Sequence, residues 1–126
     1  MLTNAKATSG FAVDDVDAAK SFYTETLGLT LEVFDEEHGV MALKFADGHD
    51  VFLYLKPDFA PATYTILNFE VDDVDAAVDD LSSRGVSFER YDGFEQDDKG
   101  IARGPGPAIA WFKDPAGNIL SVLQQP

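Results

Sequence analysis

The sequence predicts an α+β fold made of two tandem copies of a β-α-β-β-β module. A duplicated motif, helical spacing after each copy of it, and short strand patterns that end at turn residues support this prediction. Residues 13–19 read VDDVDAA, and residues 71–77, 58 positions later, read the same seven letters. The likeness continues downstream, where GLTLE at 28–32 aligns with GVSFE at 85–89. Identities of this length at such a separation indicate an internal duplication.

The first copy contains the elements of the module in order. Thr8–Val13 alternates like a short, half-buried strand. Asp14 or Asp15 then offers an N-cap carboxylate, and apolar residues recur at helical spacing until Gly28 supplies a stop. Turn residues at 35–39 and 47–48 separate the remaining strands, which are predicted over 29–34, 40–45 and 51–55.

The second copy repeats this order, with a strand over 64–71, a helix over 73–84, and strands over 86–90, 108–113 and 119–124. A long polar stretch, 92–107, interrupts it and contains several Gly and Pro residues. A loop of this length is typical of a lid or a binding loop, and a disordered excursion is the alternative. We interpret residues 1–126 as one domain, with module one at about 5–56, a linker at 57–63 and module two at about 64–125.

Charge and composition exclude several classes of partner and chemistry. The 126 residues include 9 Lys and Arg against 23 Asp and Glu, a formal net charge of −14, so nucleic acid and anionic membranes are poor partners. No apolar run approaches a membrane span and no signal-peptide pattern opens the chain, which predicts a cytoplasmic location. Without cysteine there is no disulfide, thiolate nucleophile or iron–sulfur cluster. The acidity fits a solubilising surface, attraction of cationic ligands or a high-salt habitat, and composition alone does not separate these explanations.

Two segments carry a family resemblance. The run from Phe22-Tyr23 to Leu27-Gly28-Leu29 and the segment Asp114-Pro115-Ala116-Gly117-Asn118, on a duplicated module, resemble the vicinal oxygen chelate superfamily. That superfamily includes glyoxalase I, extradiol dioxygenases, fosfomycin-resistance enzymes and bleomycin resistance proteins. The resemblance implies an open, eight-stranded, barrel-like sheet around a cavity, with the helices outside, and a homodimer.

The resemblance also implies positions for a divalent metal on equivalent strands of the two modules. In this sequence those positions and their neighbours are Thr8, Ile66, Ser121, Phe52 and Tyr54. None is His, Asp or Glu, and the only histidines, His38 and His49, fall in predicted turns. Because a divalent cation needs several anionic or imidazole ligands, we expect neither a metal nor another cofactor.

Strand alternation predicts which side chains face the cavity. Ser9, Phe11 and Val13, with Leu67, Phe69 and Val71 in the second copy, should pack under the helices. The candidate ligand-binding residues are Thr8, Phe52, Tyr54, Ile66, Asn68, Glu70, Ile109, Trp111 and Ser121. Aromatic faces near a carboxylate suit a planar or cationic ligand, and the alternative is that these aromatic rings simply fill the interior.

These observations favour a small-molecule-binding protein without the usual metal ligands, similar to bleomycin resistance proteins. The first alternative is a lyase, isomerase or dioxygenase-type enzyme, either metal-independent or with ligands at other positions. The second is a regulatory module whose cavity is filled. No nucleophile–base pair is visible in the sequence, so no catalytic residue is assigned.

Overall fold

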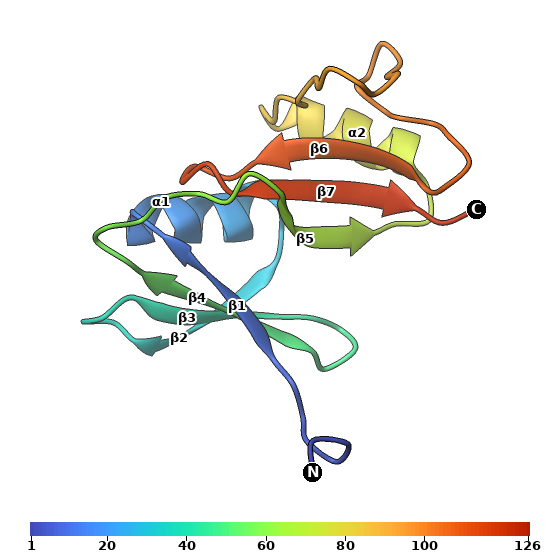
Figure 1. The fold of residues 1–126 in the computed structure, drawn as a ribbon. Helices are drawn as coiled ribbons and strands as arrows, with labels where there is room; N and C mark the ends of the chain where they lie inside the picture. The colour runs from blue at the N-terminus through green and yellow to red at the C-terminus, as the bar shows by residue number, and fades with distance from the viewer. The chain divides into compact units, whose positions relative to one another are not determined.

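The computed structural model describes all residues from Met1 to Pro126, and the chain divides into two compact units. The first unit is Met1–Phe59 and the second is Ala60–Pro126. Each unit carries one module, and the boundary lies within the segment 57–63 (Figure 1). No helix of the structure is long and apolar enough to cross a membrane.

The first unit is a four-stranded sheet with one helical segment. Its strands are β1 (Ser9–Val13), β2 (Thr30–Asp35), β3 (Val40–Lys44) and β4 (Asp50–Leu55). They lie in the order β1-β4-β3-β2, with β1 parallel to β4 and the other pairs antiparallel. The helix α1 (Val16–Ser21) continues into a π-helical turn, η1 (Phe22–Thr26), and Gly28, with φ +72°, follows its end as predicted.

The second unit is a three-stranded sheet with one helix. Its strands are β5 (Thr65–Glu70), β6 (Ala108–Lys113) and β7 (Ile119–Gln124), and its helix is α2 (Val74–Ser83). The strand order is β5-β7-β6, in which β5 runs parallel to β7 and β6 runs antiparallel to it. The predicted strands 108–113 and 119–124 are confirmed with the same bounds.

The duplicated VDDVDAA motif forms the same strand-to-helix junction in both units. The second aspartate of each copy is the N-cap: Asp15 accepts from the N–H of Ala18 at 3.0 Å and Asp73 from that of Ala76 at 3.1 Å. Both caps have extended backbones, φ −147° and −141°, as an N-cap requires. In the second unit, the side chain of Gln124 also accepts from the N–H of Val74 at 2.9 Å. The repeated motif therefore caps the start of a helix in both units, where backbone N–H groups have no partner within the helix.

The core of each unit lies where sheet and helix meet. Phe11 and Val13 are buried as predicted, and the Phe11 ring lies 6.0 Å from that of Tyr23 in η1. Ser9, predicted on the same buried face, is exposed because it lies at the first position of β1. In the second unit, α2 buries Val74, Val78 and Leu81 and contacts β6 and β7. Most apolar residues of these two strands are also buried, Phe112 and Leu120 completely. Each sheet thus keeps one face for its helix.

The structure corrects the predicted strand count. It contains seven strands in two sheets and no closed barrel, because residues 86–90 form no strand beyond a single bridge between Phe88 and Phe112. The N–H of Glu89 still donates to the carbonyl of Trp111 at 2.8 Å. The carbonyl of Glu89, however, accepts from the side chain of Gln96, which also accepts from the N–H of Tyr91 at 2.9 Å. The side chain of Gln96 therefore bonds to the Glu89 carbonyl and the Tyr91 N–H, two backbone groups that a longer strand would use for pairing.

We expect Asp73→Ala to lower the free energy of unfolding by about 1 kcal/mol, because it removes the N-cap of α2. Urea denaturation monitored by circular dichroism measures the change. Asp72→Ala is the matched control, since it removes the same charge one residue earlier and leaves the cap in place. Equal losses for the two variants would show that the cap contributes nothing beyond its charge.

Candidate functional site

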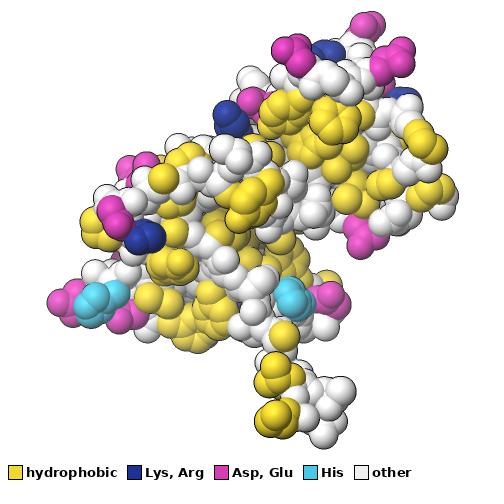
Figure 2. All heavy atoms as spheres, in the orientation of Figure 1, with side chains coloured by type: hydrophobic (Ala, Val, Ile, Leu, Met, Phe, Trp, Pro, Cys, Tyr) yellow, Lys and Arg dark blue, Asp and Glu magenta, His cyan; other side chains and the backbone are white.

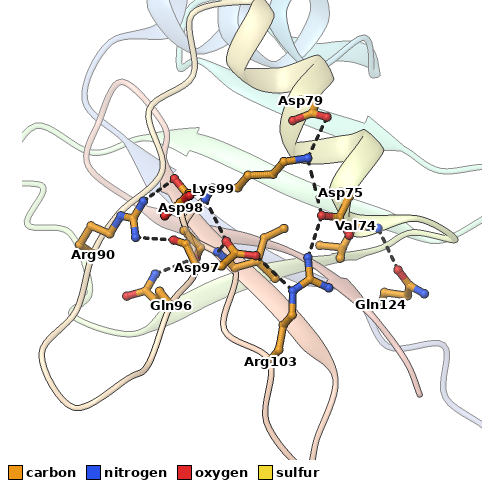
Figure 3. Close-up of polar contacts among 12 residues, drawn as sticks. Val74, Asp75, Asp79, Arg90, Gln96, Asp97, Asp98, Lys99, Arg103 and Gln124 are labelled. Atoms are coloured by element: carbon orange, nitrogen blue, oxygen red, sulfur yellow. Dashed lines mark hydrogen bonds and ion pairs between the residues drawn. The ribbon is translucent and has the colours of Figure 1, made fainter.

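The long loop of the second unit, residues 91–107, is an ordered segment that we call the strap. Its centre is the carboxylate of Asp97, whose Oδ1 accepts from the backbone N–H groups of Lys99 and Ile101, both at 2.9 Å (Figure 3). The N–H of Asp97 in turn donates to the carbonyl of Ile101 at 2.9 Å. Ile101 is almost completely buried. One aspartate therefore closes the loop on itself.

Two further side chains satisfy the carbonyl groups of the strap. Gln96 donates to the carbonyls of Glu89 and Gly100 at 2.9 and 2.7 Å. The guanidinium of Arg90 donates to the carbonyls of Asp97 and Asp98 at 2.6 and 2.7 Å (Figure 3). These bonds replace the ladder that a regular strand would provide, and they give an irregular segment a defined conformation.

The strap is attached to the sheet and to the helix of its own unit. Ala102 and Ile109 exchange both backbone hydrogen bonds, at 2.8 and 3.1 Å, so the strap pairs with β6. Toward α2, Arg103 contacts Asp75 at 2.7 Å, and Lys99 contacts Asp79 at 3.0 Å (Figure 3). Arg103 also contacts Asp97 at 3.1 Å, which links the helix to the centre of the strap.

These contacts shift the pKa values of the carboxyl groups. The hydrogen bond from Arg103 is the largest cause that lowers the pKa of Asp75. For Asp97, burial is the largest single influence and raises the pKa, but hydrogen bonds from Ile101, Arg103 and Lys99 together outweigh it, so the pKa is lowered. All the partners are substantially exposed, and solvent therefore screens each pair.

A pocket of about 350 Å³ lies between the strap and β6. Its lining residues are Gly93, Phe94, Glu95, Ala102, Arg103, Gly104, Pro105, Gly106, Pro107, Ile109 and Trp111. The rings of Phe94 and Trp111 lie 5.0 Å apart, with Phe94 56% exposed and Trp111 only 8% exposed. A volume of this size with aromatic walls is in the range of small-molecule sites.

The charges of the pocket are unequal. Arg103 lines it, but its charge is compensated by Asp75 and Asp97. Glu95 lines it too and takes no part in those ion pairs. Figure 2 shows acidic side chains beside basic ones at the end of the second unit where Figure 1 places the strap and α2. The uncompensated charge at the pocket is therefore negative.

The strand register shows how the predicted site residues of the second unit are arranged. Ser121 is opposite Trp111 on β6 and Asn68 on β5, and its hydroxyl donates to the Asn68 side chain at 2.5 Å. Leu123 is likewise opposite Ile109 and Glu70. Because opposite residues share a face, five predicted residues lie on one face of this sheet. They are Asn68, Glu70, Ile109, Trp111 and Ser121.

Only two of the five, Ile109 and Trp111, line the strap pocket. Glu70 instead lines a separate hollow of about 250 Å³ with Val71, Asp72, Gln124 and Gln125. Ile66 falls at the irregularity between Thr65 and Leu67, where the pairing of β5 shifts.

The remaining three predicted residues belong to the first unit. Phe52 and Tyr54 share one face of β4 and are paired with Gly10 and Ala12 of β1. Thr8 directly precedes β1. Tyr54 is 43% exposed, and the Phe52 ring lies 5.8 Å from that of Phe34.

The structure adds pocket residues that the sequence did not single out, notably Phe94 and Glu95. They lie in a stretch without helical or strand periodicity, where alternation assigns no face. Phe94 is an aromatic residue within an otherwise polar run, and this was the one available signal. Lys99 and Arg103 lie in the stretch that is typical of a lid or a binding loop, and the structure places both in the ion pairs of the strap.

The positions predicted for a metal carry no His, Asp or Glu side chain. No group of three or more His, Asp or Glu side chains is arranged to hold an ion. Ile66 offers no lone pair, and the buried hydroxyl of Ser121 is hydrogen-bonded to Asn68. His38 contacts Asp35 at 2.8 Å in the turn after β2, and His49 lies in the turn before β4.

The chain is similar to known proteins over nearly its whole length. The family model described as Glyoxalase/Bleomycin resistance protein/Dioxygenase superfamily matches residues 7–122. The structure of TnmS3, an antibiotic binding protein from Streptomyces sp. CB03234, is similar at 30% identity, with a TM-score of 0.70 over 98% of this chain and 99% of that one.

Two more distant structures have the same fold. A glyoxalase family protein from Enterococcus faecalis is similar at 21% identity and a TM-score of 0.68, over 98% of this chain and 99% of that one. Lactoylglutathione lyase from Agrobacterium tumefaciens is similar at 22% identity and a TM-score of 0.67, over 98% of this chain and 96% of that one. Among curated protein sequences, none matches this one.

We expect Asp97→Ala to loosen the strap. The backbone N–H groups of Lys99 and Ile101 lose their acceptor, so their hydrogen exchange should accelerate roughly tenfold. Asp98→Ala is the matched control, because only the backbone carbonyl of Asp98 holds the strap. Hydrogen exchange followed by NMR measures both variants, and similar protection in Asp97→Ala and the wild type would show that the carboxylate does not organise the strap.

The strap should also open in acid. Since the pKa values of Asp75 and Asp97 lie below the ordinary 3.8, their ion pairs contribute stability above that pH and lose it as the pH falls through the lowered values. The emission of Trp111 should therefore be constant from pH 7 to 5 and change only below about 3.8. A change between pH 7 and 5 would contradict this assignment.

Proposed function

The chain belongs to the glyoxalase/bleomycin resistance protein/dioxygenase superfamily, and from this premise we propose that it is a metal-free binding protein for small, planar aromatic molecules. The observation that carries the proposal is the pocket between the strap and β6, where Phe94 and Trp111 supply aromatic surface. Stacking on such rings binds flat molecules without any chemical step.

The nature of the pocket supports binding rather than turnover. Its polar groups are few, and Arg103, its one cation, is already paired with two carboxylates. The similarity to TnmS3, described as an antibiotic binding protein, agrees with this proposal. The unsuitable donor set at Ile66 and Ser121 supports the metal-free part of it.

Charge favours a cationic ligand within this class. The net charge of −14 attracts cations over a distance, and Glu95 adds an uncompensated carboxylate at the pocket itself. A positive charge delocalised over an aromatic system can stack on Trp111 and Phe94 and lie beside Glu95.

The other candidate ligand-binding residues stay predictions, namely Thr8, Phe52, Tyr54, Ile66, Asn68, Glu70 and Ser121. The proposal also retains the open barrel and the homodimer, which the family resemblance implies, and the cytoplasmic location, which the sequence predicts.

We expect proflavine, a planar aromatic cation, to quench the emission of Trp111 saturably, and 9-anthracenecarboxylate, a planar anion of similar size, to bind more weakly. Trp111 is the single tryptophan of the chain, so the quenching reports on this pocket alone. Glu95→Gln should weaken proflavine binding roughly two- to fivefold and leave the anion unaffected or bound more tightly. Phe94→Ala should weaken both probes by roughly two- to tenfold, because both stack.

The controls are Glu37→Gln and Tyr64→Ala, which change an exposed carboxylate and an exposed aromatic residue that do not line the pocket. Both should bind the probes like the wild type. The proposal fails if neither probe binds, or if Phe94→Ala binds both without loss. Its metal-free part fails if the purified protein holds a stoichiometric metal ion whose removal by a chelator abolishes probe binding.

A further inference from the structure

The one cation that lines the strap pocket is held by two carboxylates that do not line it. Arg103 is a lining residue, and its guanidinium uses two of its three nitrogen atoms on these partners. Nη2 donates to Asp75 of α2 at 2.7 Å, and Nε donates to Asp97 at 3.1 Å (Figure 3). The charge at the pocket wall is therefore offset by groups outside the pocket.

Asp75 is the carboxylate that two cations share. Figure 3 shows it between Arg103 and Lys99, which contacts it at 3.6 Å and contacts Asp79 at 3.0 Å. Three carboxylates, those of Asp75, Asp79 and Asp97, thus share two cations. The group keeps an excess of negative charge, and the loss of Asp75 would remove that excess.

The place of Asp75 follows from the duplicated motif. It is the last aspartate of VDDVDAA and lies in the first turn of α2, two residues after the N-cap Asp73. Residues four positions apart share a helix face, so Asp75 and Asp79 both meet the strap. Asp17 holds the equivalent place in α1, in a unit that has no strap. The motif supplies the carboxylate in both units, and only the second unit uses it at a pocket.

The balance of charge at Arg103 affects any charged ligand of the pocket. A charge acts on a ligand within a Debye length, about 8 Å at physiological salt. A guanidinium released from Asp75 would attract anions and repel cations at the pocket wall, against the effect of Glu95. A guanidinium bound by Asp75 leaves Glu95 as the dominant charge.

We propose that Asp75 is a positioning residue that sets the charge specificity of the strap pocket, because it binds and neutralises the guanidinium of Arg103. The pocket then accepts planar aromatic cations and disfavours planar aromatic anions. This inference rests on the proposed function and deepens it, since it assigns the selection of charge to a residue of α2 outside the pocket.

The test measures how Asp75→Asn changes the preference between proflavine and 9-anthracenecarboxylate, titrated by Trp111 emission. The variant should bind the cation more weakly and the anion more tightly, so the ratio of the two affinities should fall roughly three- to tenfold. Asp75→Glu keeps the charge and should keep the ratio within about twofold of the wild type. Because the Asp75 side chain is 44% exposed, both variants should fold.

Two matched controls remove the same charge elsewhere. Asp79→Asn acts on the same face of α2 and leaves both bonds of Arg103 in place, and Asp17→Asn changes the equivalent residue of the first copy. Each should alter the ratio less than about twofold. In an Arg103→Gln background, the effect of Asp75→Asn should shrink to that of Asp79→Asn, since Asp75 acts through the guanidinium.

The outcomes separate this inference from the proposed function. If neither probe quenches Trp111, the proposed function fails and the role of Asp75 fails with it. If both probes bind and Asp75→Asn keeps the ratio, or weakens the two probes equally as a loosened strap would, the role of Asp75 is overturned while the binding function stands. An equal shift in Asp79→Asn, or an undiminished one in the Arg103→Gln background, would show that Arg103 is not involved and would also overturn it.

Discussion

The candidate site depends on the hydrogen bonds that the carboxylate of Asp97 accepts from the backbone N–H groups of Lys99 and Ile101. Without them, the strap would have to leave backbone N–H groups unsatisfied beside a sheet. With them, a segment of no regular structure pairs with β6 at Ala102 and presents Phe94 to Trp111. An irregular loop can hold a pocket wall only when side chains replace the hydrogen bonds that regular structure supplies.

The same constraint acts at the junctions of the duplicated module. In each unit an aspartate turns the chain from a strand into a helix by accepting an N–H that the helix leaves free. In the second unit, two glutamine side chains also bond to free backbone groups. Gln124 accepts from the N–H of Val74, and Gln96 donates to the carbonyl of Glu89. The two copies thus share a junction and differ in the segments after the helix, since only the second copy replaces a strand with the strap.

Several of the few basic side chains of this protein lie at the strap. The chain has 9 Lys and Arg against 23 Asp and Glu. Three of the nine, Arg90, Lys99 and Arg103, act on the strap. Lys99 and Arg103 neutralise acidic residues of α2 and of the strap, whereas Arg90 binds backbone carbonyls, and Glu95 at the pocket stays uncompensated. Exposed pairs of this kind add little stability individually, and their main effect here is to position the strap.

The sequence by itself determined the duplicated module and most of its elements, because repeats, caps and spacing patterns can be read along the chain. It correctly indicated the helix start at Asp73 and the burial of Phe11 and Val13. Only the tertiary structure decided the loss of the strand at 86–90 and the order of the strap. It also decided the meeting of Phe94 and Tyr91 with Trp111 and the pairing of Arg103 with Asp75. These features depend on side chains that meet across irregular backbone, where no periodicity records which groups will be neighbours.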